Sequence, residues 1–214
     1  IYADSFLLAP FNGGGSAILL NQQPFIYDSG LQNGWEGWMW YTDLEDQNAW
    51  VQDSARHFSG QIPGGESIYE QKIYPVGQDV HFELRLDAGA EADDIGWANF
   101  VFPLPLETFK NQRYFADQSK GIYPAGYVGD NPLAENLSDL QLLPDDPARN
   151  LTLRADHAIS LWDGREWGDQ VYMVEIDLPL DGSILHFTLT PPVVDPGPNP
   201  PAVRYSHVGY LPGG

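Results

Sequence analysis

Residues 80–86, VHFELRL, carry the pattern that decides the fold of this chain. Apolar and polar side chains alternate strictly along them, the apolar set being Val80, Phe82, Leu84 and Leu86. A period of two puts the apolar residues on one face, so this pattern predicts a β-strand with one buried face. Residues 172–178, YMVEIDL, repeat the pattern. Asp181-Gly182 stands between them and the apolar run 183–190, SILHFTLT, which predicts a hairpin.

The rest of the chain consists of short apolar runs separated by glycine and proline. The 22 glycines and 18 prolines among 214 residues exceed the usual share, as is typical of β proteins with many turns. We therefore predict an all-β antiparallel β-sandwich, jelly-roll or supersandwich-like, of about ten strands with little helix. Further strands are expected at 16–20, 24–27, 35–42, 56–60, 67–74, 95–102, 150–155 and 157–161. Helical signal is confined to 104–111 and 133–140, and 110–146 is expected to be a long loop over one sandwich face.

Residues 191–201, PPVVDPGPNPP, contain six prolines and predict an extended spacer. The expected organisation is a β-sandwich domain at 1–190, a Pro-rich linker at 191–201, and the start of a following module or a terminal strand at 202–214. The chain begins with Ile1 instead of Met, so we expect a processed or excised extracellular or periplasmic segment linked to further domains.

The charge balance excludes several classes of function. With 30 acidic and 10 basic residues the net charge is -20, which disfavours nucleic acid and anionic membrane surfaces as partners. The absence of cysteine removes disulfides and thiolate metal sites. No run approaches the ~18 apolar residues of a membrane span, and glycine-rich phosphate loops are missing. We therefore expect no membrane insertion and no redox or nucleotide cofactor.

Aromatic residues gather at 35–50, where polar residues follow at once. A pyranose presents an apolar face to a flat indole and polar edges to carboxylates and amides. On a single strand 35–42, Trp38 and Trp40 share one face, and core packing is their simpler role. The predicted carbohydrate-binding residues are Trp35, Asp43, Asn48 and Trp50, with Trp162, Arg165 and Trp167 in a loop beside them.

The second cluster is Trp162–Asp169, WDGREWGD. Arg165 could hold a uronic carboxylate bidentately, or it could link loops within the protein. Hard oxygen ligands suit calcium, for which Asp43, Glu45 and Asp46 are the predicted ligands. The pairs Asp93/Asp94 and Asp145/Asp146 are weaker candidates.

Catalytic residues stay unassigned by the sequence. A glycoside hydrolase needs two acids about 5–9 Å apart, and the spacing of Glu36, Asp43, Glu70 and Glu83 singles out no pair. A lyase needs a Tyr or His base near a group that neutralises a carboxylate. The candidates for that chemistry are Arg56, His57, Tyr69 and Gln71.

Three stretches resemble known modules. Residues 203–212, VRYSHVGYLP, resemble the first strand of the immunoglobulin-like module of family 9 glycoside hydrolases, with YSH where V-N-Q is usual. Residues 26–40, IYDSGLQNGWEGWMW, look like the opening of several bacterial carbohydrate-binding β-sandwiches. The order HFSGQI, IYEQKIYPVGQDVHFELRL, IGWANFVFPL, LWDGREWGDQVYMVEIDLPL resembles accessory β-sandwich domains of multidomain glycoside hydrolases.

These resemblances imply a non-catalytic carbohydrate-binding or accessory domain of a secreted polysaccharide-degrading enzyme, with a polysaccharide or oligosaccharide as partner. Two alternatives stay open. One is a β-sandwich polysaccharide lyase or glycoside hydrolase in its own right, and the other is a structural or adhesive extracellular subunit.

Overall fold

A computed structural model describes residues 2–3, 6–10, 12–35, 38–41, 43–63, 65–89, 95–168 and 170–192. The strands are β1 (Tyr2–Ala3), β2 (Phe6–Pro10), β3 (Ser16–Leu20), β4 (Gln23–Trp35), β5 (Trp38–Tyr41), β6 (Glu45–Gln52), β7 (Ala55–Gln61), β8 (Ile68–Val76), β9 (Asp79–Asp87), β10 (Trp97–Pro105), β11 (Arg113–Ala116), β12 (Ser119–Ile122), β13 (Ala134–Leu142), β14 (Leu151–Asp163), β15 (Val171–Asp177) and β16 (Asp181–Thr190). The helical turns are η1 (Asn12–Gly14), α2 (Leu106–Phe109) and η3 (Gly164–Trp167).

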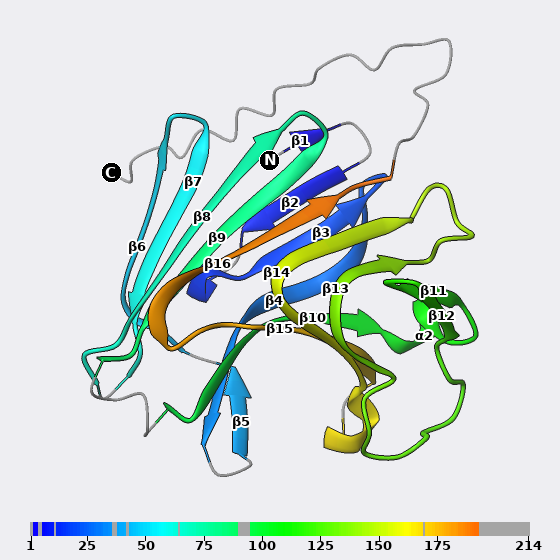
Figure 1. Cartoon of the computed structure of the whole chain (residues 1–214). Helices are drawn as coiled ribbons and strands as arrows, with labels where there is room; N and C mark the ends of the chain where they lie inside the picture. Colours follow the sequence, from blue (N-terminus) through cyan, green and yellow to red (C-terminus); the bar gives the residue numbers. More distant parts are fainter. Residues whose placement is uncertain are drawn as a thin grey trace, which may run out of the picture.

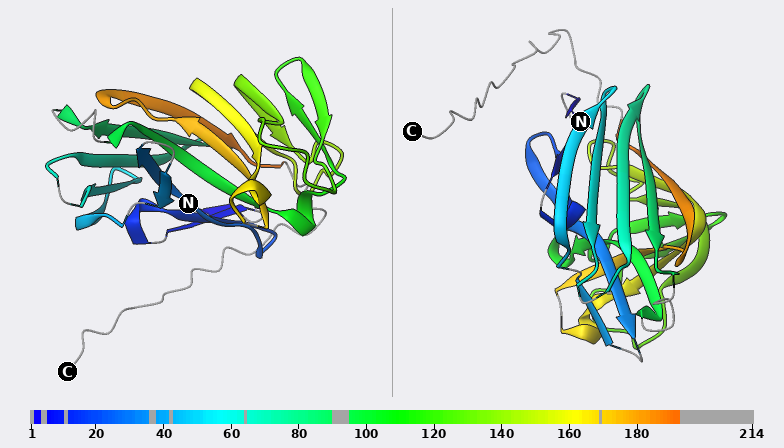
Figure 2. Two further views of the ribbon diagram at one scale, coloured as in Figure 1. Left: turned by 90° about the horizontal axis from the view of Figure 1, so that it is seen from below. Right: turned by 90° about the vertical axis from the view of Figure 1, so that its left-hand side faces the viewer.

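The strands form one antiparallel sheet that curls into two facing layers (Figures 1 and 2). The hydrogen-bonded order is β1-β2-β3-β4-β10-β15-β14-β16-β9-β8-β7-β6. The long strand β14 joins the layers, because its first half pairs with β16 and its second half with β15. We call β6, β7, β8, β9 and β16 the first layer, and β2, β3, β4, β10 and β15 the second layer. The all-β antiparallel prediction is confirmed, with more strands than the ten expected.

Phenylalanines from both layers fill the core between them. In the first layer, Phe82 of β9 stacks on Phe187 of β16, with ring centroids 4.3 Å apart and 14° between planes. Across the core, Phe100 of β10 lies 5.4 Å from Phe187, and Phe102 meets the same ring edge-on at 5.9 Å. All four are 2% exposed or less. The alternation of 80–86 thus points its apolar side chains inward, as predicted.

The two ends of the curled sheet meet at η1. Gly14 has φ +75°, and a Cβ there would lie 2.8 Å from the Phe58 ring, so only glycine fits without displacing it. The Gly13 N–H donates to Gln47 Oε1 of β6 at 3.1 Å. Arg56 of β7 donates to Ser16 Oγ of β3 at 3.2 Å. These contacts tie the first layer to the second.

Three local predictions are wrong. β15 and β16 form no hairpin, because β14 lies between them. Gly182, with φ +78°, lies within β16 at a register shift against β9. The single strand predicted at 35–42 is instead the end of β4 and the separate strand β5, with Trp35 opposite Trp38. The helix expected at 133–140 is β13, whereas α2 does form inside 104–111.

The segment 110–146, expected to be loop, contains β11, β12 and β13. Tyr114 and Tyr123 pack inward, with Tyr123 fully buried and 4.9 Å from the Tyr172 ring, whereas Tyr127 is 47% exposed. No helix among the described residues is long and apolar enough to span a membrane. Residues 193–214, which include most of the predicted linker and the whole tail, lie outside the described part, so the domain organisation stays a prediction.

Removing the central ring of the core is the change expected to affect stability most. Phe187→Ala should lower the free energy of unfolding by roughly 3–5 kcal/mol, because a large cavity replaces contacts with three other rings. Ile184→Ala on the same strand, where the side chain is 45% exposed, serves as the control and should change stability by less than about 0.5 kcal/mol. Chemical denaturation of both variants checks this. Equal effects would contradict the assigned core.

Candidate functional site

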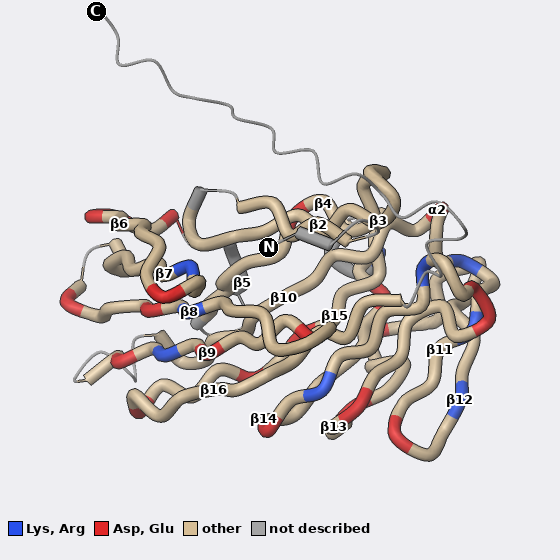
Figure 3. Tube along the Cα trace, turned by 90° about the horizontal axis from the view of Figure 1, so that it is seen from above, with Lys and Arg blue, Asp and Glu red and all other residues tan. Residues whose placement is uncertain are grey.

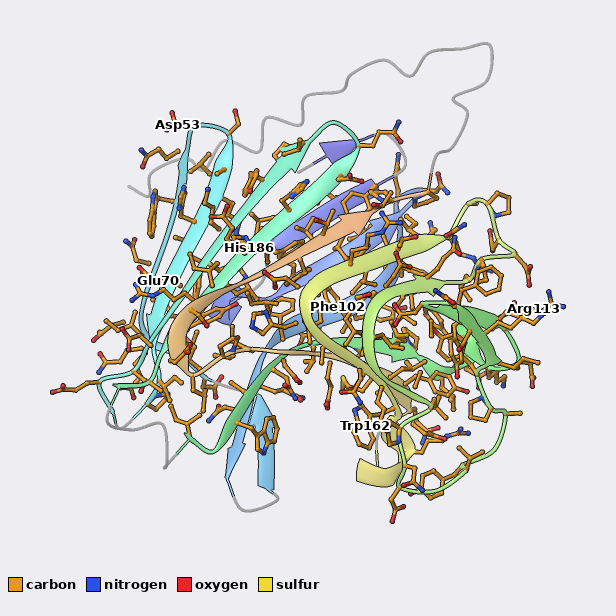
Figure 4. The ribbon with its side chains drawn as sticks, in the orientation of Figure 1. Asp53, Glu70, Phe102, Arg113, Trp162 and His186 are labelled. Carbon is orange, nitrogen blue, oxygen red and sulfur yellow. The ribbon has the colours of Figure 1, made fainter. Side chains whose placement is uncertain are left out.

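The outward side chains of the first layer form an ordered polar surface, which we call the polar face. Strand register places Trp50, His57, Lys72, Glu83 and His186 opposite one another on five consecutive strands. Directly paired residues lie on the same side of a sheet, so these five side chains make a row across the layer. At a strand spacing of ~4.8 Å the row spans about 19 Å. Figure 4 shows two labelled residues of this face, Glu70 and His186.

An aromatic stack stands at the edge of the row. The Trp50 and His57 rings are 5.0 Å apart and only 8° from parallel. Trp50 remains 40% exposed, because β6 is an edge strand with every residue exposed. His57 supports one face of the indole and leaves the opposite face as a flat apolar surface.

Glu83 is held by two donors at the centre of the face. Lys72 Nζ donates to its carboxylate at 3.0 Å, and the Tyr74 hydroxyl donates at 2.8 Å. Burial alone would raise the pKa of Glu83, but these hydrogen bonds outweigh it and the pKa lies below its usual value. Lys72 also lies 4.5 Å above the Tyr74 ring, against which His81 stacks. Glu83 is therefore a fixed, ionised acceptor.

Depressions follow one another along the polar face. The central one has a volume of about 200 Å³ and is lined in part by Trp50, His57, Lys72, Glu83 and Arg85. A second, of about 360 Å³, shares Arg85 with it, and a third, of about 390 Å³, shares His57 and Lys72. The shared residues place the three depressions side by side across the strands. Lys72 and Arg85 each pair across the strands with an acidic residue, Glu83 and Glu70. Figure 3 shows both charge types on β8 and β9.

Two of the predicted sugar-binding residues belong to the polar face. Asn48 and Trp50 lie on β6, and Asn48 pairs with Ser59 in the row next to that of Trp50. Asp43 is exposed just before β6. The backbone of Trp35 ends β4 in the second layer, and its side chain lies outside the described part. The structure therefore separates Trp35 from Trp50, which the sequence placed on one surface.

The other predicted residues lie elsewhere. Trp162 lies one residue before the end of β14, far from Glu70 and His186 in Figure 4. Arg165 binds Asp163 bidentately, at 2.7 Å and 2.6 Å, and donates to the Pro124 and Ala125 carbonyls at 3.0 Å and 2.8 Å. The loop-linking role is thus what the structure shows for Arg165, and sugar binding there stays a prediction. The side chain of Trp167, in η3, is outside the described residues.

The four candidate residues for lyase chemistry lie on opposite faces of the sheet. His57 faces outward, whereas Tyr69 and Gln71 are buried between the layers and joined by a 3.1 Å hydrogen bond. Arg56 also points inward, to Ser16. These residues cannot act together on one substrate, so this reading of them is wrong.

The predicted calcium ligands show no assembled site. Asp43, Glu45 and Asp46 are all exposed at the start of β6. In the ranges that the structure describes, no three His, Asp or Glu side chains gather as a metal-binding group. Asp145 and Asp146 pair with Arg113 and Arg149 instead, and Asp93/Asp94 lie outside those ranges. Calcium binding stays a prediction.

Sequence reasoning missed a buried acid, Glu175 of β15. It is 9% exposed and accepts a hydrogen bond from Asn99 Nδ2 at 3.2 Å. Burial, helped by the charge of Asp177, raises the pKa of Glu175 from 4.5 to about 7. The Glu-x-Asp spacing at 175–177, which puts both acids on one strand face, was the available signal.

Glu175 should make stability depend on pH. Its pKa is higher in the folded state than in the unfolded state. The stability that Glu175 contributes is therefore fully present below about pH 4.5 and is lost as the pH rises through about 7. Glu175→Gln stays neutral at every pH, so it escapes this loss. As the pH rises from ~5 to ~8, its free energy of unfolding should increase, relative to that of the native chain, by on the order of 3 kcal/mol. Urea unfolding at both pH values measures this, with the exposed Glu135→Gln as control. Parallel pH profiles for Glu175→Gln and the native chain would show that the acid is not buried.

Comparison with known proteins shows the fold alone. No protein-family profile and no curated sequence matches the chain. A galactose mutarotase-like protein from Lactobacillus casei ATCC 334 aligns with a TM-score of 0.50 and 13% identity, over 89% of this chain and 97% of that one. A galactose mutarotase related enzyme from Lactobacillus acidophilus gives 0.49 and 9%, over 89% and 95%. A glycoside hydrolase family 97 enzyme from Pseudoalteromonas sp. strain K8 gives 0.48 and 9%, over 86% of this chain and 34% of that one. The chain thus shares its β-sandwich fold with the galactose mutarotase-like protein, at low identity.

Proposed function

We propose that this chain is a carbohydrate-binding β-sandwich that holds a polysaccharide along the polar face. The role is that of a non-catalytic accessory domain in a secreted polysaccharide-degrading enzyme. The observation that carries the proposal is the parallel Trp50–His57 stack at the exposed end of a row of fixed polar side chains. A flat aromatic surface beside hydrogen-bonding groups is the composition that sugar sites share.

The polar side chains beside the stack suit hydroxyl groups, which both donate and accept. Glu83 offers carboxylate oxygens, while Lys72 and Arg85 offer donors within the same hollow. Arg85 is held by Glu70 at 3.3 Å, Asp87 at 3.2 Å and the Gly182 carbonyl at 2.9 Å. Side chains already fixed by such contacts lose little conformational entropy on binding a ligand.

An enzymatic role is the second candidate, and the Glu175–Asp177 pair is the feature that favours it. A carboxylic acid with a raised pKa beside a second carboxylate is the arrangement used for acid–base work on glycosides. Assays for reducing ends and for unsaturated uronate absorbance, on a polysaccharide panel, separate the two candidates. Turnover that Glu175→Gln abolishes would replace the binding proposal with an enzymatic one.

Trp50→Ala is the direct test of the polar face. It should weaken polysaccharide binding by about 1–3 kcal/mol, the range for a lost aromatic contact, and leave the melting temperature nearly unchanged because the side chain is on an exposed edge strand. Affinity electrophoresis in gels containing the retaining polysaccharide measures the loss.

The matched control is Tyr27→Ala, which removes an aromatic that is 59% exposed on β4 in the second layer. Its retardation in the gel should equal that of the native chain. Retardation of Trp50→Ala equal to that of the native chain would overturn the proposed surface.

A further inference from the structure

The outer face of the second layer holds a separate group of polar side chains. Register places Gln32 of β4 opposite Asn99 of β10, and Asn99 opposite Asp177 of β15. Glu175 is two residues from Asp177 and therefore shares its face. The Asn99–Glu175 hydrogen bond joins two members of the group. Trp162 of β14 lies on the same face, because Ser160, two residues before it, pairs with Glu175.

One member of this group has an unfilled acceptor. Gln32 is 3% exposed, yet its Oε1 has no hydrogen-bond partner. A buried acceptor without a donor costs free energy, so an ordered water or a bound group that donates to it would stabilise the protein. The oxygen lies on the face that carries Asn99 and Glu175, so a ligand bound there would supply the missing donor.

The charges around this group restrict the chemical class of its ligand. β4, β10 and β15 contain no lysine or arginine, so Glu175 and Asp177 face outward without a basic residue on these strands. The basic group that acts on Asp177 is His157 of β14. An anionic ligand would be repelled, whereas hydroxyl groups would donate to the carboxyls and to Gln32.

We propose that Gln32, Asn99 and Glu175, with Trp162 beside them, form a second sugar-binding site that takes a neutral pyranose. Trp162 supplies the aromatic surface, and the three polar side chains supply acceptors for hydroxyl groups. The polar face differs in carrying Lys72 and Arg85. The second site is independent of the polar face, and it binds whether or not a reaction follows.

The test uses D-glucose, D-galactose and D-mannose as neutral probes and D-glucuronate as the charged match of D-glucose. Saturation-transfer NMR titrations at millimolar sugar should show that at least one neutral probe binds. If D-glucose binds, D-glucuronate should bind with an affinity that is lower by roughly tenfold or more. Gln32→Leu should weaken the neutral probe about tenfold. Its melting temperature, measured alongside, shows whether the variant is folded.

Control variants separate binding at this site from binding on the polar face and from a failure to fold. Tyr27→Ala, which removes an exposed aromatic on β4 outside this group, should bind the neutral probe like the native chain. A loss in Gln32→Leu that is larger than the loss in Trp50→Ala separates this site from the polar face. If Gln32→Leu does not fold, Asn99→Ala at a half-buried position replaces it, with the same tenfold loss expected. The proposal is overturned if the native chain binds none of the neutral probes, if the folded variant binds them unchanged, or if Trp50→Ala abolishes their binding.

Discussion

The packing of Phe82, Phe100 and Phe187 across the two layers is the contact on which the rest of the structure depends. It joins β9 and β16 of the first layer to β10 of the second. Because side chains alternate along a strand, fixing these rings inward also fixes which neighbours point outward. His81 and Glu83 flank Phe82, and His186 and Thr188 flank Phe187. The polar face is thus a consequence of the core.

The sequence predicted best where one face of a strand is buried. The alternation around Phe82 and around Val174 identified β9 and β15, and from them the all-β class. The alternation pattern did not identify β6, because all residues of β6 are exposed and show no period. It did not identify β13 either, because bulges interrupt the alternation there. The hairpin at Gly182 failed because a local turn signal does not show which strand β16 will pair with.

The candidate site was predictable in composition more than in position. Trp50 and Asn48 are on the proposed surface, but their partners His57, Lys72 and Glu83 come from three other strands, and only tertiary pairing brings them into register. Arg165 was singled out for its charge, which Asp163 and two carbonyls take up. Glu175 stood in an ordinary strand pattern, and its burial depends on how β10 and β14 pack beside it.

The chain's five histidines offer the most direct test of the polar face, because His57, His81 and His186 lie on it whereas His157 does not. The measurement is the imidazole Cε1–H spectrum, recorded by NMR with and without a retained polysaccharide or its oligosaccharide. We predict that His57, beneath the Trp50 ring, shifts most and His186 next, while His157 keeps its position. Binding that shifts none of the three histidines of the polar face would contradict the account.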